Sequence, residues 1–146
     1  MWNELNEEAE VNAFLDKIWH FHDSCITEMK YKSGAYVNQD YAMHPINDCQ
    51  NLRMVIQRQC SELSMIELEF IHLNWMRLFP VSQTYTCEIF SATIELRQDC
   101  VLWYNEDKLS EADLETFDGI LICAEKLRWR EIKNHMGPDD YWVESR

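Results

Sequence analysis

The reactive side chains of this sequence are most concentrated between residues 20 and 25, where two imidazoles, a carboxylate, a hydroxyl and a thiol follow one another closely. In an extended segment, side chains two positions apart point the same way, so His20 and His22 have a spacing that metal ligands use. A metal site would need a further ligand, such as Asp23, His72 or a cysteine. The alternative is structural: His22 or Asp23 hydrogen-bonds backbone groups where a helix meets a strand.

A nucleophilic thiol is a second hypothesis for the same stretch. Cys25 could attack a substrate with His20 or His22 as its base. A reactive thiolate needs nearby positive charge or a helix N-terminus, whereas Cys25 follows a predicted helix end in an acidic chain. We therefore assign no catalytic residue, and we expect His20, His22 and Asp23 to bind a ligand or a partner if they have a function.

Lys126, Arg128 and Arg130 alternate along one predicted strand and form the only concentrated positive charge in the sequence. They could hold an anionic ligand or the acidic surface of a partner, and arginine suits a two-pronged contact with a carboxylate. The alternative is cross-strand pairing with acidic side chains of the same chain. Candidates for such pairing are Glu67, Glu69 and Glu95. Glu67 and Glu69 also have a spacing suited to acid/base chemistry, but a solvated strand face is the simpler explanation.

The charge balance restricts the partners. Twenty-six Asp and Glu against thirteen Lys and Arg give a net charge of −13, which repels nucleic acids and anionic membranes and favours a basic protein partner. The first residues lack the pattern of a signal peptide, and no apolar run has the length of a membrane span, so we expect a cytoplasmic protein.

The six cysteines are spaced singly, which predicts reduced thiols rather than a zinc site. With three glycines and no phosphate-binding pattern, we expect no cofactor.

The hydrophobic pattern changes from helical to alternating near residue 20. Before it, apolar residues recur at helical spacing in one stripe over a predicted helix spanning residues 3–18. The stripe consists of Val11, Phe14, Leu15, Ile18 and Trp19. After it, alternation predicts six strands, over residues 25–31, 52–57, 66–78, 86–96, 100–104 and 120–132. The third strand changes phase near His72, as at a β-bulge.

The connections complete the predicted architecture. Residues 32–50 are rich in turn dipeptides and form either a binding loop or a loop with a short strand around residues 35–37. The capping-box pattern at Ser110 predicts a helical turn that ends near Phe117. Tyr141 and Trp142 should dock on the body of the protein. We therefore expect a single α+β domain over residues 1–146. Its N-terminal helix packs on a curved antiparallel sheet of about six strands, as a meander or a partly open barrel.

The segment Phe21-His22-Asp23-Ser24-Cys25-Ile26 resembles the opening of small, largely uncharacterised bacterial β-rich proteins, some of which are immunity proteins of polymorphic toxin systems. Their shared pattern is Phe-His-Asp, a small residue, any residue and an aliphatic residue, followed by antiparallel strands. The resemblance implies a binding protein rather than an enzyme, and it assigns no catalytic residue.

Two hypotheses for the function follow. The first is an acidic, immunity-like module, monomeric or homodimeric, that associates with a basic protein through its negative surface and exposed aromatic side chains. The second is a small ligand-binding barrel or a metal-dependent enzyme that uses the His20 and His22 cluster.

Overall fold

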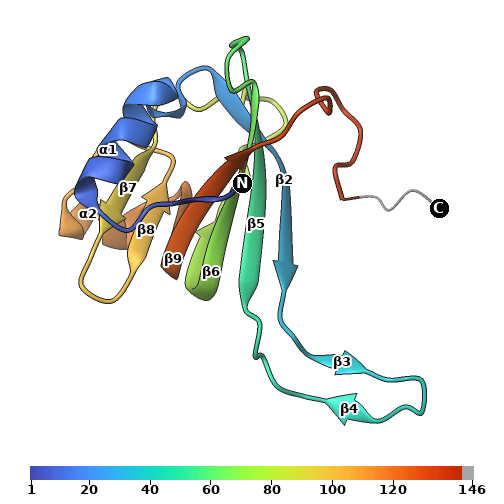
Figure 1. Cartoon of the computed structure of the whole chain (residues 1–146). Coiled ribbons are helices and arrows are strands. Elements are labelled where there is room, and N and C mark those ends of the chain that lie inside the picture. Colours follow the sequence, from blue (N-terminus) through green and yellow to red (C-terminus); the bar gives the residue numbers. More distant parts are fainter. Residues whose placement is uncertain (143–146) are drawn as a thin grey trace.

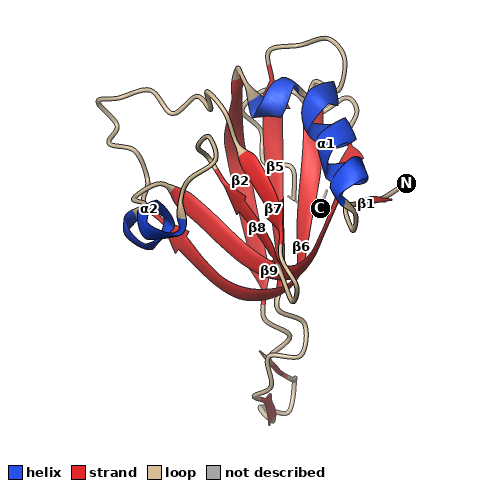
Figure 2. Ribbon diagram, turned by 90° about the vertical axis from the view of Figure 1, so that its left-hand side faces the viewer, coloured by secondary structure: helices blue, strands red, loops and turns tan. Residues whose placement is uncertain are grey.

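The computed structural model describes residues 1–142 and has an α+β fold (Figure 1). Two helices, α1 (Glu8–Lys17) and α2 (Glu111–Thr116), pack on opposite faces of one antiparallel sheet. The sheet is strongly curved but open (Figure 2), so the predicted class is confirmed and the barrel alternative is wrong. Neither helix in the described part of the chain has the length and apolar content needed to cross a membrane.

Seven strands form the main sheet, in the spatial order β2, β5, β6, β9, β8 and β7, with β1 paired to β9. Their bounds are β1 (Asn3–Glu4), β2 (Ser24–Lys32), β5 (Asn51–Arg58), β6 (Met65–Leu78), β7 (Thr93–Leu96), β8 (Val101–Tyr104) and β9 (Ile120–Glu131). The remaining strands, β3 (Tyr36–Val37) and β4 (Met43–His44), form a separate hairpin. This confirms the short strand expected around residues 35–37.

The strand order corrects the expected meander. After β6 the chain crosses to the far edge of the sheet as an irregular segment over residues 79–92, and β7, β8 and β9 then return toward β6. The last strand therefore lies in the middle of the sheet. The fourth strand is also shorter than the predicted residues 86–96, because its first half belongs to the crossing segment, where Ile89 makes only an isolated bridge to Ser24.

The helix begins later than the sequence pattern predicts. Asn3 and Glu4 are extended and pair with β9, and the Leu5 N–H donates to the Leu127 carbonyl at 3.0 Å, so the first residues gain sheet hydrogen bonds. The helix proper follows Glu7, whose N–H donates to the Glu10 carboxylate at 3.0 Å. Of the predicted apolar stripe, the first four members are buried, whereas Trp19 is 69% exposed because the chain leaves the helix before it.

The main core lies between α1 and the face of the sheet that we call the inner face. Phe14 of α1 stacks on Trp129 of β9 with ring centroids 4.6 Å apart, and Phe21 meets Trp103 of β8 edge to face at 5.7 Å. The predicted bulge in β6 is present: His72 has a positive φ, and the register with β9 shifts between Leu73 and Trp75. Before the bulge the inward side chains of β6 are fully buried, and beyond it Leu73 and Met76 still pack partly buried against the core.

The outer face of the sheet carries a cluster of buried charges on β5, β6 and β9. The Glu67 carboxylate is completely buried, with Arg53 Nε 2.6 Å from Oε1 and Arg130 Nε 2.7 Å from Oε2. Glu69 pairs with Arg128 at 2.8 Å. Burial lowers the pKa of Arg130, but the hydrogen bond and charge of Glu67 outweigh this and hold that pKa above its ordinary value. These cross-strand pairs join β9 to two consecutive strands, β5 and β6, that lie far from it in the sequence.

Both ends of the described chain cover this outer face. The Trp2 ring lies over the guanidinium groups of Arg128 and Arg130, with centroid distances of 4.6 and 4.5 Å. Tyr141 and Trp142 pack against a small apolar cluster, which confirms that these two rings dock. The cluster consists of Val55, Met65 and Ile132.

We expect the Glu67→Gln variant to lose about 2–4 kcal/mol of unfolding free energy, because it leaves two arginines without their buried counter-charge. About a third of each arginine side chain is exposed to solvent. The loss of unfolding free energy should therefore be smaller than for a fully buried ion pair. Urea denaturation measures it. Glu125→Gln, at an exposed position of β9, is the matched control and should change stability by less than about 0.5 kcal/mol. Equal effects of the two substitutions would contradict the role given to Glu67.

Candidate interaction groove

The stretch that the sequence analysis singled out folds into a left-handed turn. Trp19, His20 and Phe21 have φ values of 53°, 52° and 65°, and Asp23 has 56°. Non-glycine residues in this region cost about 1–2 kcal/mol each, so the surrounding structure must hold the turn in place. Phe21 does so from inside, since its ring is fully buried against Phe14 and Trp103.

The turn also holds the start of β7. The His20 carbonyl accepts the Ala92 N–H at 2.8 Å, the Asp23 N–H donates to the Ile89 carbonyl at 3.1 Å, and His22 Nδ1 lies 2.9 Å from the Phe90 carbonyl oxygen. Three contacts therefore tie residues 20–23 to residues 89–92, just before β7 begins. The strained turn positions an edge strand of the sheet.

The free edge of β7 lies along a groove of about 700 Å³. One wall is α1 with the turn, and the other is the segment that leads into α2. Asn12, Leu15 and His20 line the first wall, and Asp107 and Ser110 belong to the second. The groove hence combines α1 and the turn with two elements that lie much later in the sequence.

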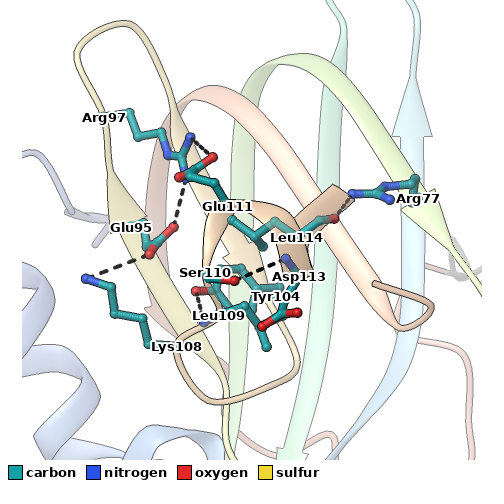
Figure 3. Close-up of polar contacts among 10 residues, drawn as sticks. All are labelled: Arg77, Glu95, Arg97, Tyr104, Lys108, Leu109, Ser110, Glu111, Asp113 and Leu114. Carbon is teal, nitrogen blue, oxygen red and sulfur yellow. Dashed lines mark hydrogen bonds and ion pairs between the residues drawn. The ribbon is translucent and has the colours of Figure 1, made fainter. Parts of the chain in front are cut away.

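Acidic side chains outnumber basic ones in the groove, which contains Glu8, Glu95, Asp107 and Glu111 against Arg97 and Lys108. Both bases are held by acids (Figure 3). Arg97 Nη2 lies 3.2 Å from Glu95 and also contacts Glu111, and Lys108 Nζ lies 4.0 Å from Glu95. The hydrogen bond to Glu111 raises the pKa of Arg97. Within residues 1–142, Glu8 and Asp107 are exposed and form no ion pair, so they remain for an incoming cation.

Hydrogen bonds to the backbone hold the second wall in place, although its charged side chains are exposed. Ser110 accepts the Asp113 N–H at 3.2 Å and thereby starts α2, as the capping pattern predicts. The Tyr104 hydroxyl accepts the Leu109 N–H at 3.1 Å, and Arg77 donates to the last carbonyls of α2 (Figure 3). Burial raises the pKa of Tyr104.

The structure brings only part of the predicted site residues together. His20, His22 and Asp23 share the turn, and of these only His20 lines the groove. His22 faces the Phe90 carbonyl and lies 3.5 Å from Asp23, and His72 lies on the bulge of β6. No three His, Cys, Asp or Glu side chains in residues 1–142 form a group that could hold a metal ion.

The three cations predicted to alternate along β9 lie in two different environments. Arg128 and Arg130 contribute to the outer ion-pair cluster with Glu69 and Glu67, which is the cross-strand pairing that the sequence left open. Lys126 is exposed and lines a smaller pocket beside Asp99 and Cys100. The three cations do not share one binding site with the histidines.

Sequence reasoning did not identify the acidic groove. Glu95 appeared only as a possible pairing partner, and Glu8 and Asp107 had no assigned role. The signal available was the amphipathic strand Thr-Ile-Glu-Leu over residues 93–96, but nothing local indicates that its free edge lies between two walls.

A second exposed feature is the arm formed by β3, β4 and the adjoining loops, which projects from the sheet away from both helices (Figure 1). It is internally ordered: the Tyr36 and His44 rings stack at 5.0 Å, and His44 Nε2 lies 2.9 Å from Asp48. Several large apolar side chains on it are exposed. They are Tyr36, Val37, Tyr41, Met43 and Ile46.

The His20→Gly variant should be more stable than the wild type by about 0.5–1 kcal/mol, because glycine adopts a positive φ without the steric cost. His20→Ala keeps that cost and should not stabilise the protein. The lost contact of His20 with Asp16, at 3.5 Å between exposed groups, contributes little. Urea denaturation compares the variants, and a destabilised glycine variant would contradict the strained turn.

Alkylation tests the nucleophile hypothesis for Cys25. Burial, followed by the nearby Cys87, raises the pKa of Cys25, so less thiolate is present at pH 8. Iodoacetamide should therefore modify Cys25 several-fold more slowly than the exposed Cys60 and Cys87. Peptide mapping by mass spectrometry gives the order, and a fastest reaction at Cys25 would revive the catalytic hypothesis.

The segment over residues 21–26, for which the sequence suggested a resemblance, forms the end of the turn and the start of β2. A function for this chain therefore has to follow from the arrangement of its own residues. Comparison with known proteins finds no family model that matches the chain, and neither a curated protein nor a solved structure has significant similarity to it.

Proposed function

We propose that this chain is a non-catalytic protein-binding module that holds a basic segment of a partner protein in the groove beside β7. The observation that carries the proposal is the surplus of carboxylates around that groove, in a chain of net charge −13. Such a field attracts a cationic partner over about 10 Å at 0.1 M salt and speeds its association. The compartment that suits it is the cytoplasm.

The arm supplies a contact of a different kind. Exposed tyrosines and aliphatic side chains on an ordered hairpin suit the apolar part of a protein surface, and aromatic residues contribute much of the energy of protein interfaces. We propose that the groove attracts the basic region of the partner while the arm contacts an apolar region.

The resemblance at residues 21–26 suggests what the association achieves. An immunity-like protein acts by occupying its partner, and it needs no chemistry of its own. In this chain the matching residues hold the start of β7 and hence one end of the groove. The proposal therefore gives the motif a positioning role in binding.

Binding of the peptide Ac-Lys-Val-Lys-Val-Lys-Val-NH2, followed by calorimetry, tests the function. We expect binding at 20 mM salt that weakens at 200 mM salt, because exposed charges are screened. The double variant Glu8→Lys/Asp107→Lys should bind at least about tenfold more weakly, since it reverses both free carboxylates of the groove.

The control is the double variant Glu62→Lys/Glu131→Lys, which makes the same charge change at exposed positions outside the groove. It should stay within about threefold of the wild type. Equal losses in both double variants would show that net charge alone attracts the peptide. That result, or no binding by the wild type, would refute the proposed function.

A further inference from the structure

We infer that the partner's basic segment binds as an additional β-strand, hydrogen-bonded to the free edge of β7. The inference rests on the proposed function and specifies how the groove recognises its ligand. What carries it is a juxtaposition: the backbone edge of an outermost strand forms the floor of the acidic groove. Addition of a strand to a sheet edge is a common way for proteins to recognise extended peptides.

The register identifies the backbone groups that remain for such a strand. In an antiparallel pair, hydrogen-bonded and non-hydrogen-bonded residue pairs alternate. The Arg97 N–H donates to the Cys100 carbonyl at 2.8 Å and closes the hairpin, so Glu95 and Thr93 also direct their backbone groups toward β8. The N–H and C=O groups of Ile94 and Leu96 then point away from β8, into the groove.

The two edges of the sheet differ in how they are protected. The free edge of β2 has a bulge near Thr27 and carries Lys30 and Lys32. Its first residue is also bridged by Ile89. All three features oppose pairing with another strand. On β7, the sequence Thr-Ile-Glu-Leu has no proline, lysine or bulge. Its edge lies instead in the groove between α1 and the segment that leads into α2.

The side chains around β7 define the sequence that such a strand would have. On the inner side, an added strand meets apolar groups of Leu15, Ile94 and Leu96. On the outer side it meets Glu95 and Glu111, which pair with Arg97 and Lys108, and Asp107, which is unpaired within the described residues, while the likewise unpaired Glu8 lies on the wall formed by α1. Because successive side chains of a strand point to opposite faces, the ligand should alternate aliphatic with cationic residues. Four residues of β7 span about 13 Å, so a ligand strand of four to six residues suffices.

The matched pair Leu96→Pro and Leu96→Ala tests the strand. Both variants lose the leucine side chain, but only proline removes the N–H that faces the groove and places its ring there. That N–H is not used in the pairing with β8, so the fold should tolerate proline at this edge. With the Lys-Val peptide at 20 mM salt, we expect Leu96→Pro to bind at least about tenfold more weakly than Leu96→Ala.

Hydrogen exchange on the wild-type protein gives an independent readout. Addition of the peptide should slow exchange at the Ile94 and Leu96 amides and leave the amides at the outer edge of β2 unchanged. Binding that depends on Glu8 and Asp107 but neither protects these amides nor distinguishes the two Leu96 variants would overturn strand addition and leave the proposed function standing. If the wild type does not bind the peptide at all, both proposals fail.

Discussion

The buried carboxylate of Glu67, held between Arg53 on β5 and Arg130 on β9, is the interaction on which the order of the sheet depends. A buried carboxylate is unfavourable without cations beside it, so β5 and β9 must flank β6 at one register. With β9 next to β6, the strands β8 and β7 can only extend the sheet outward. The free edge of β7, and with it the groove, follows from that placement.

A second constraint sets where the groove ends. The left-handed turn at residues 19–21 is unfavourable by itself, and it persists because Phe21 fills the core and the His20 carbonyl binds Ala92. The turn thus joins the end of α1 to the start of β7. The histidines that suggested a metal site in the sequence have structural contacts here: the His20 carbonyl accepts the Ala92 N–H, and His22 Nδ1 lies beside the Phe90 carbonyl. The carboxylates around β7 make the groove acidic.

Paired charges and unpaired carboxylates lie in different parts of the structure. On the outer face, arginines and glutamates neutralise each other under Trp2, so this cluster offers little unpaired charge to a partner. Around β7 the two bases are held by Glu95 and Glu111, while Glu8 and Asp107 stay free within the described residues. Within the described residues the groove thus holds two unpaired carboxylates of a chain whose net charge is −13.

The sequence by itself determined where most strands lie, the bulge near His72, the start of α2 and the apolar stripe of α1, because each depends on the alternation or spacing of neighbouring residues. Only the tertiary structure decided the strand order, the extended first residues, the left-handed turn and the acidic groove. These depend on contacts between residues far apart in the chain, such as Glu67 with Arg130 and His20 with Ala92. Local patterns indicate that Glu69 and Arg128 could pair. They do not indicate that β9 then lies beside β6 while β7 becomes the outermost strand.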